Sequence, residues 1–324
     1  MKAQGPRRGA VQEGIVVRDT GAGTVQKAAV LLPEAVRQPG DLPLHKPLAP
    51  GARQALALRA DPNITPSLPD GRLDGVAYAR AVLAEIRRIK EKEPHRRCVV
   101  IFDLDNTLFE TRARTRAVLK AFDPITFANL PLEKIGWNAE ETCHNLQRPE
   151  LAAAAQAHWA EAFWDGANFG HDLLMEVMAE LAQEAASAKA EIFYLSGRIE
   201  DLREASRAQL LAAELPLASE AHLVLKPSME VRTSPFKAEW LLELEASGAF
   251  IGWFATDSHK EIREIGAHEQ AAQGDADLPL LLVEHPLTRP APDDGRTPVF
   301  PGPAARLRDL RDQGKSAAPK STLQ

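Results

Sequence analysis

Five short segments of the chain are apolar at almost every position, a pattern typical of parallel strands that are covered on both faces. The first is Cys98-Val99-Val100-Ile101-Phe102, and the others are 191–195, 222–225, 250–254 and 278–283. Segments with apolar residues at three- and four-residue steps alternate with these runs, which predicts helices. They are 73–93, 171–187, 200–213, 235–246 and 258–268. The alternation predicts an α/β fold with a doubly wound, open parallel sheet.

One interval in this alternation is too long for a single crossover. Between Phe102 and Glu191 lie 88 residues, whereas a crossover needs roughly 10–12 residues including its helix. We therefore expect a helical cap, 111–168, inserted after the first strand, where ligands bind in open α/β folds. Its aromatic residues either line a pocket or form the small core of the insert, and we favour the core. They are Trp137, Trp159, Phe163 and Trp164.

Prolines and irregular patterning mark the flanks of the predicted domain. Residues 1–72 mix Pro and Gly with no sustained period of 2 or 3.6, so we expect a largely irregular N-terminal extension. The α/β core is expected to comprise 73–110 and 169–305, followed by a tail over 306–324. We expect both ends of the chain to lie outside the compact domain.

Composition narrows the classes of function. The 324 residues are 44% hydrophobic and 26% charged with a net charge of −6, so the charge balance argues against general binding to nucleic acid or to an anionic membrane. No run of eighteen apolar residues occurs, and a membrane span is not expected. Cys98 and Cys143 are far apart and lack a CxxC spacing, so we expect a cytoplasmic protein, with Cys98 buried in its strand.

Polar residues capable of chemistry follow the predicted strands directly. Asp103-Leu104-Asp105-Asn106-Thr107 ends the first strand, Ser196-Gly197-Arg198 ends the second, and Asp257 ends the fourth, with Glu261 four residues later. Lys237 lies near the start of the helix before the fourth strand. Because the carboxyl ends of parallel strands meet at one edge of a sheet, these side chains should converge there.

The order and spacing of these residues resemble the four motifs of the haloacid dehalogenase-like (HAD) phosphohydrolase superfamily. The resemblance covers about 97 to 285, and the insert lies where the family's C1-type cap lies. It implies a Mg²⁺ ion held by Asp103, by the backbone carbonyl of Asp105 and by Asp257, and a phosphate bound by Thr107, Ser196 and Lys237. A small phosphorylated substrate is implied as well; oligomeric state is left open.

Phosphoryl transfer requires the residue types that follow the predicted strands. It needs an anionic nucleophile, a divalent cation and fixed donors for the phosphoryl oxygens. Asp103 is the expected nucleophile, forming an aspartyl-phosphate. Asp105, on the same side of an extended chain, would protonate the leaving alcohol and then activate water. For this the pKa of Asp105 must rise above about 3.9, which burial or a neighbouring carboxylate would achieve.

Two features leave alternatives open at the site. Lys226, directly after the third strand, could also reach the phosphate, and we favour Lys237 because it lies at a helix start. The second acid of motif IV is often Asp, whereas here it is Glu261, which leaves the outer shell of the metal undefined.

Arg112, Arg114 and Arg116 are interpreted as a solvated helix face. Cys143, His144 and His259 are interpreted as exposed polar residues without the spacing of a metal site.

The favoured function is a Mg²⁺-dependent phosphatase acting on a phosphomonoester. A polynucleotide end phosphatase is an alternative because Leu195-Ser196-Gly197-Arg198 resembles a run found in repair members of the family, although the acidic net charge argues against it. A phosphotransferase would pass the phosphoryl group to another hydroxyl. A binding protein that has lost turnover is the alternative from a different class.

Overall fold

The computed structural model describes residues 55, 57–59, 61–68, 72–273, 278–287 and 297–300. Most of the expected N-terminal extension and the whole expected C-terminal tail lie outside the described residues. The elements with described bounds are eight strands, eight α-helices and five short 3-10 turns, and residues 57–59 are helical as well. The strands are β1 (Cys98–Phe102), β2 (Phe109–Glu110), β3 (Leu173–Leu174), β4 (Glu191–Ile199), β5 (Leu223–Lys226), β6 (Phe250–Thr256), β7 (Leu280–Val283) and β8 (Val299–Phe300). The helices are α2 (Gly75–Lys92), α3 (Arg112–Phe122), α4 (Ala139–Asn145), α5 (Ala152–Ala162), α6 (Glu176–Ser187), α7 (Arg203–Ala212), α8 (Thr233–Ala246) and α9 (His259–Gln273).

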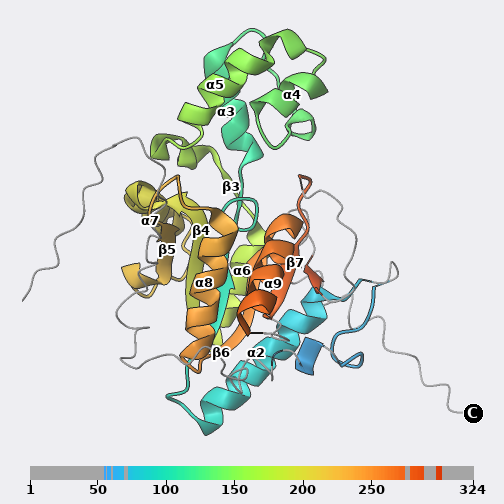
Figure 1. Ribbon diagram of the computed structural model, residues 1–324, viewed down its shortest axis with the longest axis vertical. Helices are drawn as coiled ribbons and strands as arrows, with labels where there is room; N and C mark the ends of the chain where they lie inside the picture. The colour runs from blue at the N-terminus through green and yellow to red at the C-terminus, as the bar shows by residue number, and fades with distance from the viewer. Residues whose placement is uncertain are drawn as a thin grey trace, which may run out of the picture.

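A six-stranded parallel sheet forms the centre of the molecule (Figure 1), in the order β5-β4-β1-β6-β7-β8. The chain runs from β1 outward to β4 and β5, then returns to β6 on the other side of β1. This is the doubly wound arrangement that the apolar runs predicted. Strand β8 was not expected, because two residues are too short to give a hydrophobic pattern.

Helices cover both faces of the sheet. Alternate residues of β1 point to opposite faces: Val100 and Phe102 pack with α2, α6 and α7, whereas Val99 and Ile101 pack with α8 and α9. The five residues of β1 are all fully buried, including Cys98, as expected. Burial on both faces explains why the strand sequences lack an alternation of polar and apolar residues.

Helix α2 illustrates how local sequence sets the start and end of an element. The Asp74 side chain accepts hydrogen bonds from the Val76 and Ala77 amides, at 2.9 and 3.1 Å, and so caps the first turn. The helix ends at Lys92, two residues before Pro94, which cannot continue it. Its apolar stripe is buried against the sheet, and Tyr78 donates to the Gly252 carbonyl at 2.7 Å.

The insert stands beyond one end of the sheet, with α3, α4 and α5 grouped together (Figure 1). A short antiparallel ribbon of β2 and β3 connects it to the core. The insert has an apolar core of its own, to which Trp159 contributes as expected, whereas Phe163 packs between Trp159 and the guanidinium of Arg114. The core members are Leu119, Phe127, Leu130, Ile135, Ala139, Cys143, Ala152 and Ala155. Within the described part of the chain, no helix is both long and apolar enough to cross a bilayer.

Candidate active site

The turn after β1 holds its two aspartates in place through backbone hydrogen bonds. The Leu104 carbonyl accepts from the Leu108 and Phe109 amides, and the Asp103 amide donates to the Ala255 carbonyl of β6 at 2.9 Å. Asn106 has a φ of 58°, a left-handed conformation that asparagine tolerates better than most residues. Its Oδ1 accepts from the backbone and the hydroxyl of Thr111, which closes the turn at the start of the insert.

Asp103 is paired with Lys237, at the base of the site. Lys237 Nζ donates to Asp103 Oδ2 at 2.7 Å and to Glu261 Oε2 at 2.8 Å. Burial raises the pKa of Asp103, the charge of Lys237 lowers it, and the charge of Glu261 raises it again. The resulting pKa of Asp103 is about 7. Of the two lysines considered from the sequence, Lys237 is therefore the one that contacts the predicted nucleophile. Glu261, whose role the sequence left undefined, holds Lys237 and also accepts from Thr256 Oγ1 at 3.0 Å.

Asp257 lies close to Asp103, across the ends of β1 and β6. Burial, followed by the negative charges of Asp103 and Glu261, raises the pKa of Asp257 well above its ordinary value. The Asp257 amide donates to Thr107 Oγ1 at 3.1 Å. The Thr107 side chain is fully buried and links the two aspartate-bearing segments. Its expected part in phosphate binding stays a prediction.

The charges around Asp103 fit a divalent cation. Three buried or half-buried carboxyl groups, those of Asp103, Asp257 and Glu261, lie around the ammonium of Lys237. When all are ionised, this Asp103 cluster has a net charge of 3 − 1 = 2 negative units. Buried carboxylates with excess negative charge are suitable ligands for Mg²⁺, which prefers oxygen and retains several waters. Among the described residues, no group of three or more His, Cys, Asp or Glu side chains is arranged to hold a metal, so an ion bound here would need a backbone carbonyl and waters as further ligands.

Asp105 faces a second, charge-balanced group of residues. Arg198 donates to both carboxylate oxygens, from Nε at 3.0 Å and from Nη2 at 2.8 Å, and Arg114 Nη2 donates to Oδ1 at 2.8 Å. Arg114 also binds Asp172 through two hydrogen bonds, one of them 2.8 Å from Nε. We refer to Asp105, Asp172, Arg114 and Arg198 as the Asp105 cluster. Two carboxylates and two guanidinium groups leave it neutral.

This cluster corrects two expectations from the sequence. Arg114 has no exposed surface, so it does not belong to a solvated helix face. The pKa of Asp105 was expected to rise, but it is lowered: burial would raise it, and the charges and hydrogen bonds of Arg198 and Arg114 outweigh burial. In this arrangement Asp105 is a carboxylate.

Aromatic rings and an amide complete the surroundings of the two arginines. The Arg114 guanidinium lies 4.4 Å from the ring centroids of both Phe163 and Phe169, and that of Arg198 lies 4.0 Å from Phe169. Gln209 Nε2 donates to Asp172 Oδ2 at 2.7 Å, and Gln209 Oε1 accepts from Arg198 at 2.8 Å. No sequence pattern pointed to Asp172, Phe169 or Gln209, because they meet Asp105 and its arginines only through packing of the segment after α5 and of α7.

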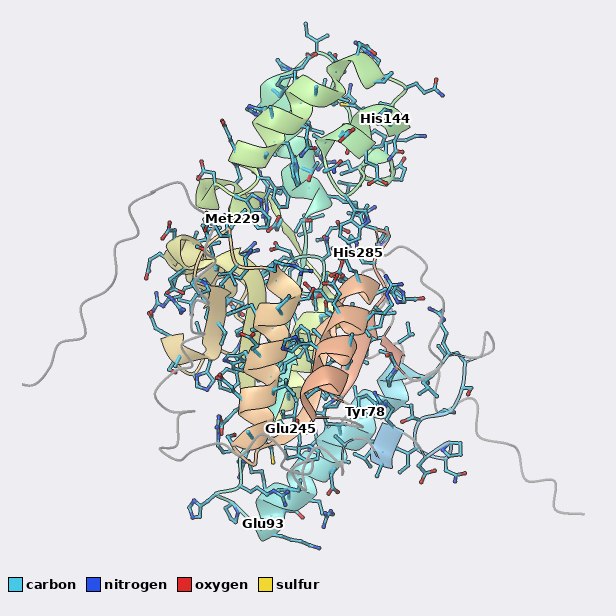
Figure 2. All side chains as sticks on the ribbon, viewed as in Figure 1. Tyr78, Glu93, His144, Met229, Glu245 and His285 are labelled. Carbon is cyan, nitrogen blue, oxygen red and sulfur yellow. The ribbon has the colours of Figure 1, made fainter. Side chains whose placement is uncertain are left out.

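The remaining site residues lie at the carboxyl ends of β4 and β5. Ser196 is buried, and its Oγ accepts from the Arg198 amide at 3.2 Å, which leaves the hydroxyl hydrogen for a ligand. Lys226 is also buried. Figure 2 places His144 far out on the insert, exposed as expected, whereas Cys143 beside it is buried in the insert's core, contrary to the expectation of an exposed residue.

Comparisons with known proteins give matches among solved structures alone. No family model and no curated protein matches the chain. Protein tyrosine kinase A from Mycobacterium tuberculosis is 16% identical, with 68% of this chain and 98% of that chain covered and a TM-score of 0.45. A HAD-superfamily hydrolase of subfamily IA from Geobacter sulfurreducens is 15% identical, with coverage of 67% and 99% and a TM-score of 0.39. A haloacid dehalogenase-like hydrolase from Xanthomonas campestris is 16% identical, with coverage of 68% and 98% and a TM-score of 0.39. We therefore infer function from the residues of the site.

Proposed function

We propose that the protein is a Mg²⁺-dependent phosphatase that hydrolyses a small phosphomonoester through an aspartyl-phosphate on Asp103. The contact between Lys237 and Asp103 is the main support, because it puts a fixed cation beside a buried carboxylate at the carboxyl edge of the sheet. The excess negative charge of the Asp103 cluster supports the choice of a divalent cation. Asp103, Asp257 and the Asp105 carbonyl would hold the ion, and Glu261 would hold Lys237.

Each residue has a defined part in this reaction. An Asp103 oxygen attacks phosphorus, the ester P–O bond breaks, and the leaving oxygen takes a proton from Asp105. Water then attacks the phosphoryl group, gives a proton to Asp105, and the bond to Asp103 breaks to release inorganic phosphate. Ser196 and Lys237 donate to the phosphoryl oxygens in both steps. When bound, Mg²⁺ would supply neutralisation of the phosphoryl charge.

The pairing of Asp105 with two arginines suits one of its two proposed roles and not the other. A carboxylate held by Arg198 and Arg114 can accept a proton from water, but it has none to give to a leaving group. For Asp105 to donate a proton, its ion pair with one of the two arginines must first weaken. Arg114 belongs to the insert, so we propose that a shift of α3 frees Asp105 for protonation before the ester bond breaks.

Hydrolysis of p-nitrophenyl phosphate by the purified full-length protein tests the proposal. We expect turnover that requires Mg²⁺, abolished by Asp103→Asn and retained by Asp201→Asn, a matched change at an exposed residue. A phosphorylated Asp103 peptide should accumulate in Asp105→Asn, in which water is not activated. Full activity of Asp103→Asn would exclude the proposed mechanism.

Three further measurements separate the alternatives. Phosphorylated glycerol formed in the presence of added glycerol would indicate a phosphotransferase. Salt-dependent retention on a DNA or RNA column would favour a polynucleotide end phosphatase. Magnesium binding without turnover over a broad panel of phosphoesters would indicate a binding protein.

A further inference from the structure

Lys226 is a buried lysine beside the site with no carboxylate in hydrogen-bond or ion-pair contact among the described residues, although exposed Glu230 acts on its charge. The residue is 6% exposed, and its ammonium makes no hydrogen bond or ion pair with any described residue. Lys237, by contrast, is paired with both Asp103 and Glu261. Most of the Lys226 side chain is enclosed, and lysines are rarely buried unless they are paired.

Lys226 lies on the side of the sheet where Lys237 lies. It is the last residue of β5 and pairs with Ile199 of β4. Two residues earlier in the strand, Val224 packs with residues of α8, such as Phe236 and Trp240, and strand alternation directs Lys226 to this same face. Burial and then the charge of Lys237 lower the pKa of Lys226, and exposed Glu230 opposes them. The charge of Lys237 therefore reaches Lys226.

Besides the exposed carboxylate of Glu230, Lys226 has positive charge in its surroundings. Helix α8 begins at Thr233, and its N-cap residue Arg232 makes no side-chain capping bond, so the first turn carries the partial positive charge of a helix N-terminus. Gly197 of β4 lies so close to this turn that a Cβ there would be 2.9 Å from Thr233 Cγ2. Figure 2 shows Met229, three residues beyond Lys226, at the cap-side end of the core. An anion is the ligand that these charges favour.

We propose that Lys226 binds a second anionic group of the substrate, a carboxylate or a second phosphate, distinct from the phosphoryl group that is transferred. One strand, β4, separates β5 from β1, and strands are about 4.8 Å apart, so the end of β5 lies on the order of 10 Å from the strand that bears Asp103. That separation suits two anionic groups on one small molecule. This inference rests on the proposed function and narrows its substrates to phosphorylated compounds with a second acid.

Binding of two matched phosphonates tests the inference without turnover. 6-Phosphonohexanoate carries a phosphonate and a carboxylate joined by a five-methylene chain that can span this separation, whereas hexylphosphonate carries the phosphonate alone. By calorimetry with Mg²⁺, we expect the full-length protein to bind 6-phosphonohexanoate about tenfold more tightly, as a hydrogen-bonded ion pair implies. Lys226→Met should reduce this ratio to within about twofold, whereas Lys226→Arg and the exposed control Lys120→Met should retain it.

The melting temperature supplies an independent readout. Because Lys226 is unpaired in the described structure, Lys226→Met should raise the melting temperature of the ligand-free protein, whereas a lysine with a structural role would lower it on removal. If Lys226→Met does not fold, Lys226→Gln serves for the same comparison.

Three results would overturn the inference. The first is an unchanged ratio of the affinities for the two phosphonates in Lys226→Met. The second is equal weakening of both phosphonates, which would assign Lys226 to the transferred phosphoryl group. The third is no binding of either probe by the unaltered protein. Failure of the proposed function would instead appear as absent hydrolysis of p-nitrophenyl phosphate, whatever the binding ratio.

Discussion

Arg114, in the first helix of the insert, donates a hydrogen bond of 2.8 Å to Asp105, in the turn after the central strand. The insert therefore contacts the predicted acid and base directly. Asp172, where the chain returns to the core, binds the same guanidinium. The position of the insert and the charge state of Asp105 are coupled through one side chain.

Replacing Arg114 should destabilise the protein strongly. Arg114→Ala leaves Asp172 and Asp105 buried with one fewer cation, and loss of one partner from a buried ion pair costs about 3 kcal/mol. Arg116→Ala, at an exposed position of the same helix, should change the free energy of unfolding by less than about 0.5 kcal/mol. Urea denaturation of both variants measures the difference in their free energies of unfolding. A change in Arg114→Ala as small as that in Arg116→Ala would show that the Asp105 cluster contributes no stability.

Glu110 should make stability depend on pH. Burial raises its pKa, but hydrogen bonds from His285 and Arg112 outweigh burial and hold the pKa at about 2, below the ordinary 4.5. Since the folded pKa is depressed, this contribution is fully present above pH 4.5 and is lost as pH falls toward 2. It amounts to about 3 kcal/mol.

Unfolding of Glu110→Gln across this range checks the prediction. The variant should be less stable than the unaltered protein at neutral pH, and the gap should narrow between pH 4.5 and pH 2. Glu133→Gln, an exposed position in the insert, should follow the unaltered protein throughout. A gap independent of pH would contradict the assigned role of the Glu110 charge.

Thr107 should control the affinity for magnesium. Its Oγ accepts from the Asp257 amide, so Thr107→Val, which keeps the shape and removes the acceptor, leaves that buried amide unpaired and frees the predicted ligand to move. We expect the Mg²⁺ concentration for half-maximal activity to rise about tenfold or more. Thr107→Ser keeps the hydroxyl and should behave nearly as the unaltered protein; matching values for Val and Ser would refute the prediction.

Glu261 should act on turnover through Lys237. Glu261→Gln removes a charge that holds the Lys237 ammonium beside Asp103, and loss of such a supporting partner typically reduces activity about 10- to 100-fold. Steady-state kinetics should show the loss mainly in kcat. Glu264→Gln, one turn later on the same helix, is the matched control, and a comparable loss in that variant would argue against a specific role for Glu261.

The sequence determined the central sheet and the location of the site, because both depend on local patterns. The apolar run of β1 is buried on both faces, and the aspartates that follow it lie where parallel strands end. Only the tertiary structure decided which charges meet. Lys237 rather than Lys226 contacts Asp103, and Arg114 turns inward to Asp105, because ion pairs depend on how separate elements pack together. Pairing also reversed the expected shift of the Asp105 pKa, since the environment of a buried carboxylate depends on neighbours from several elements.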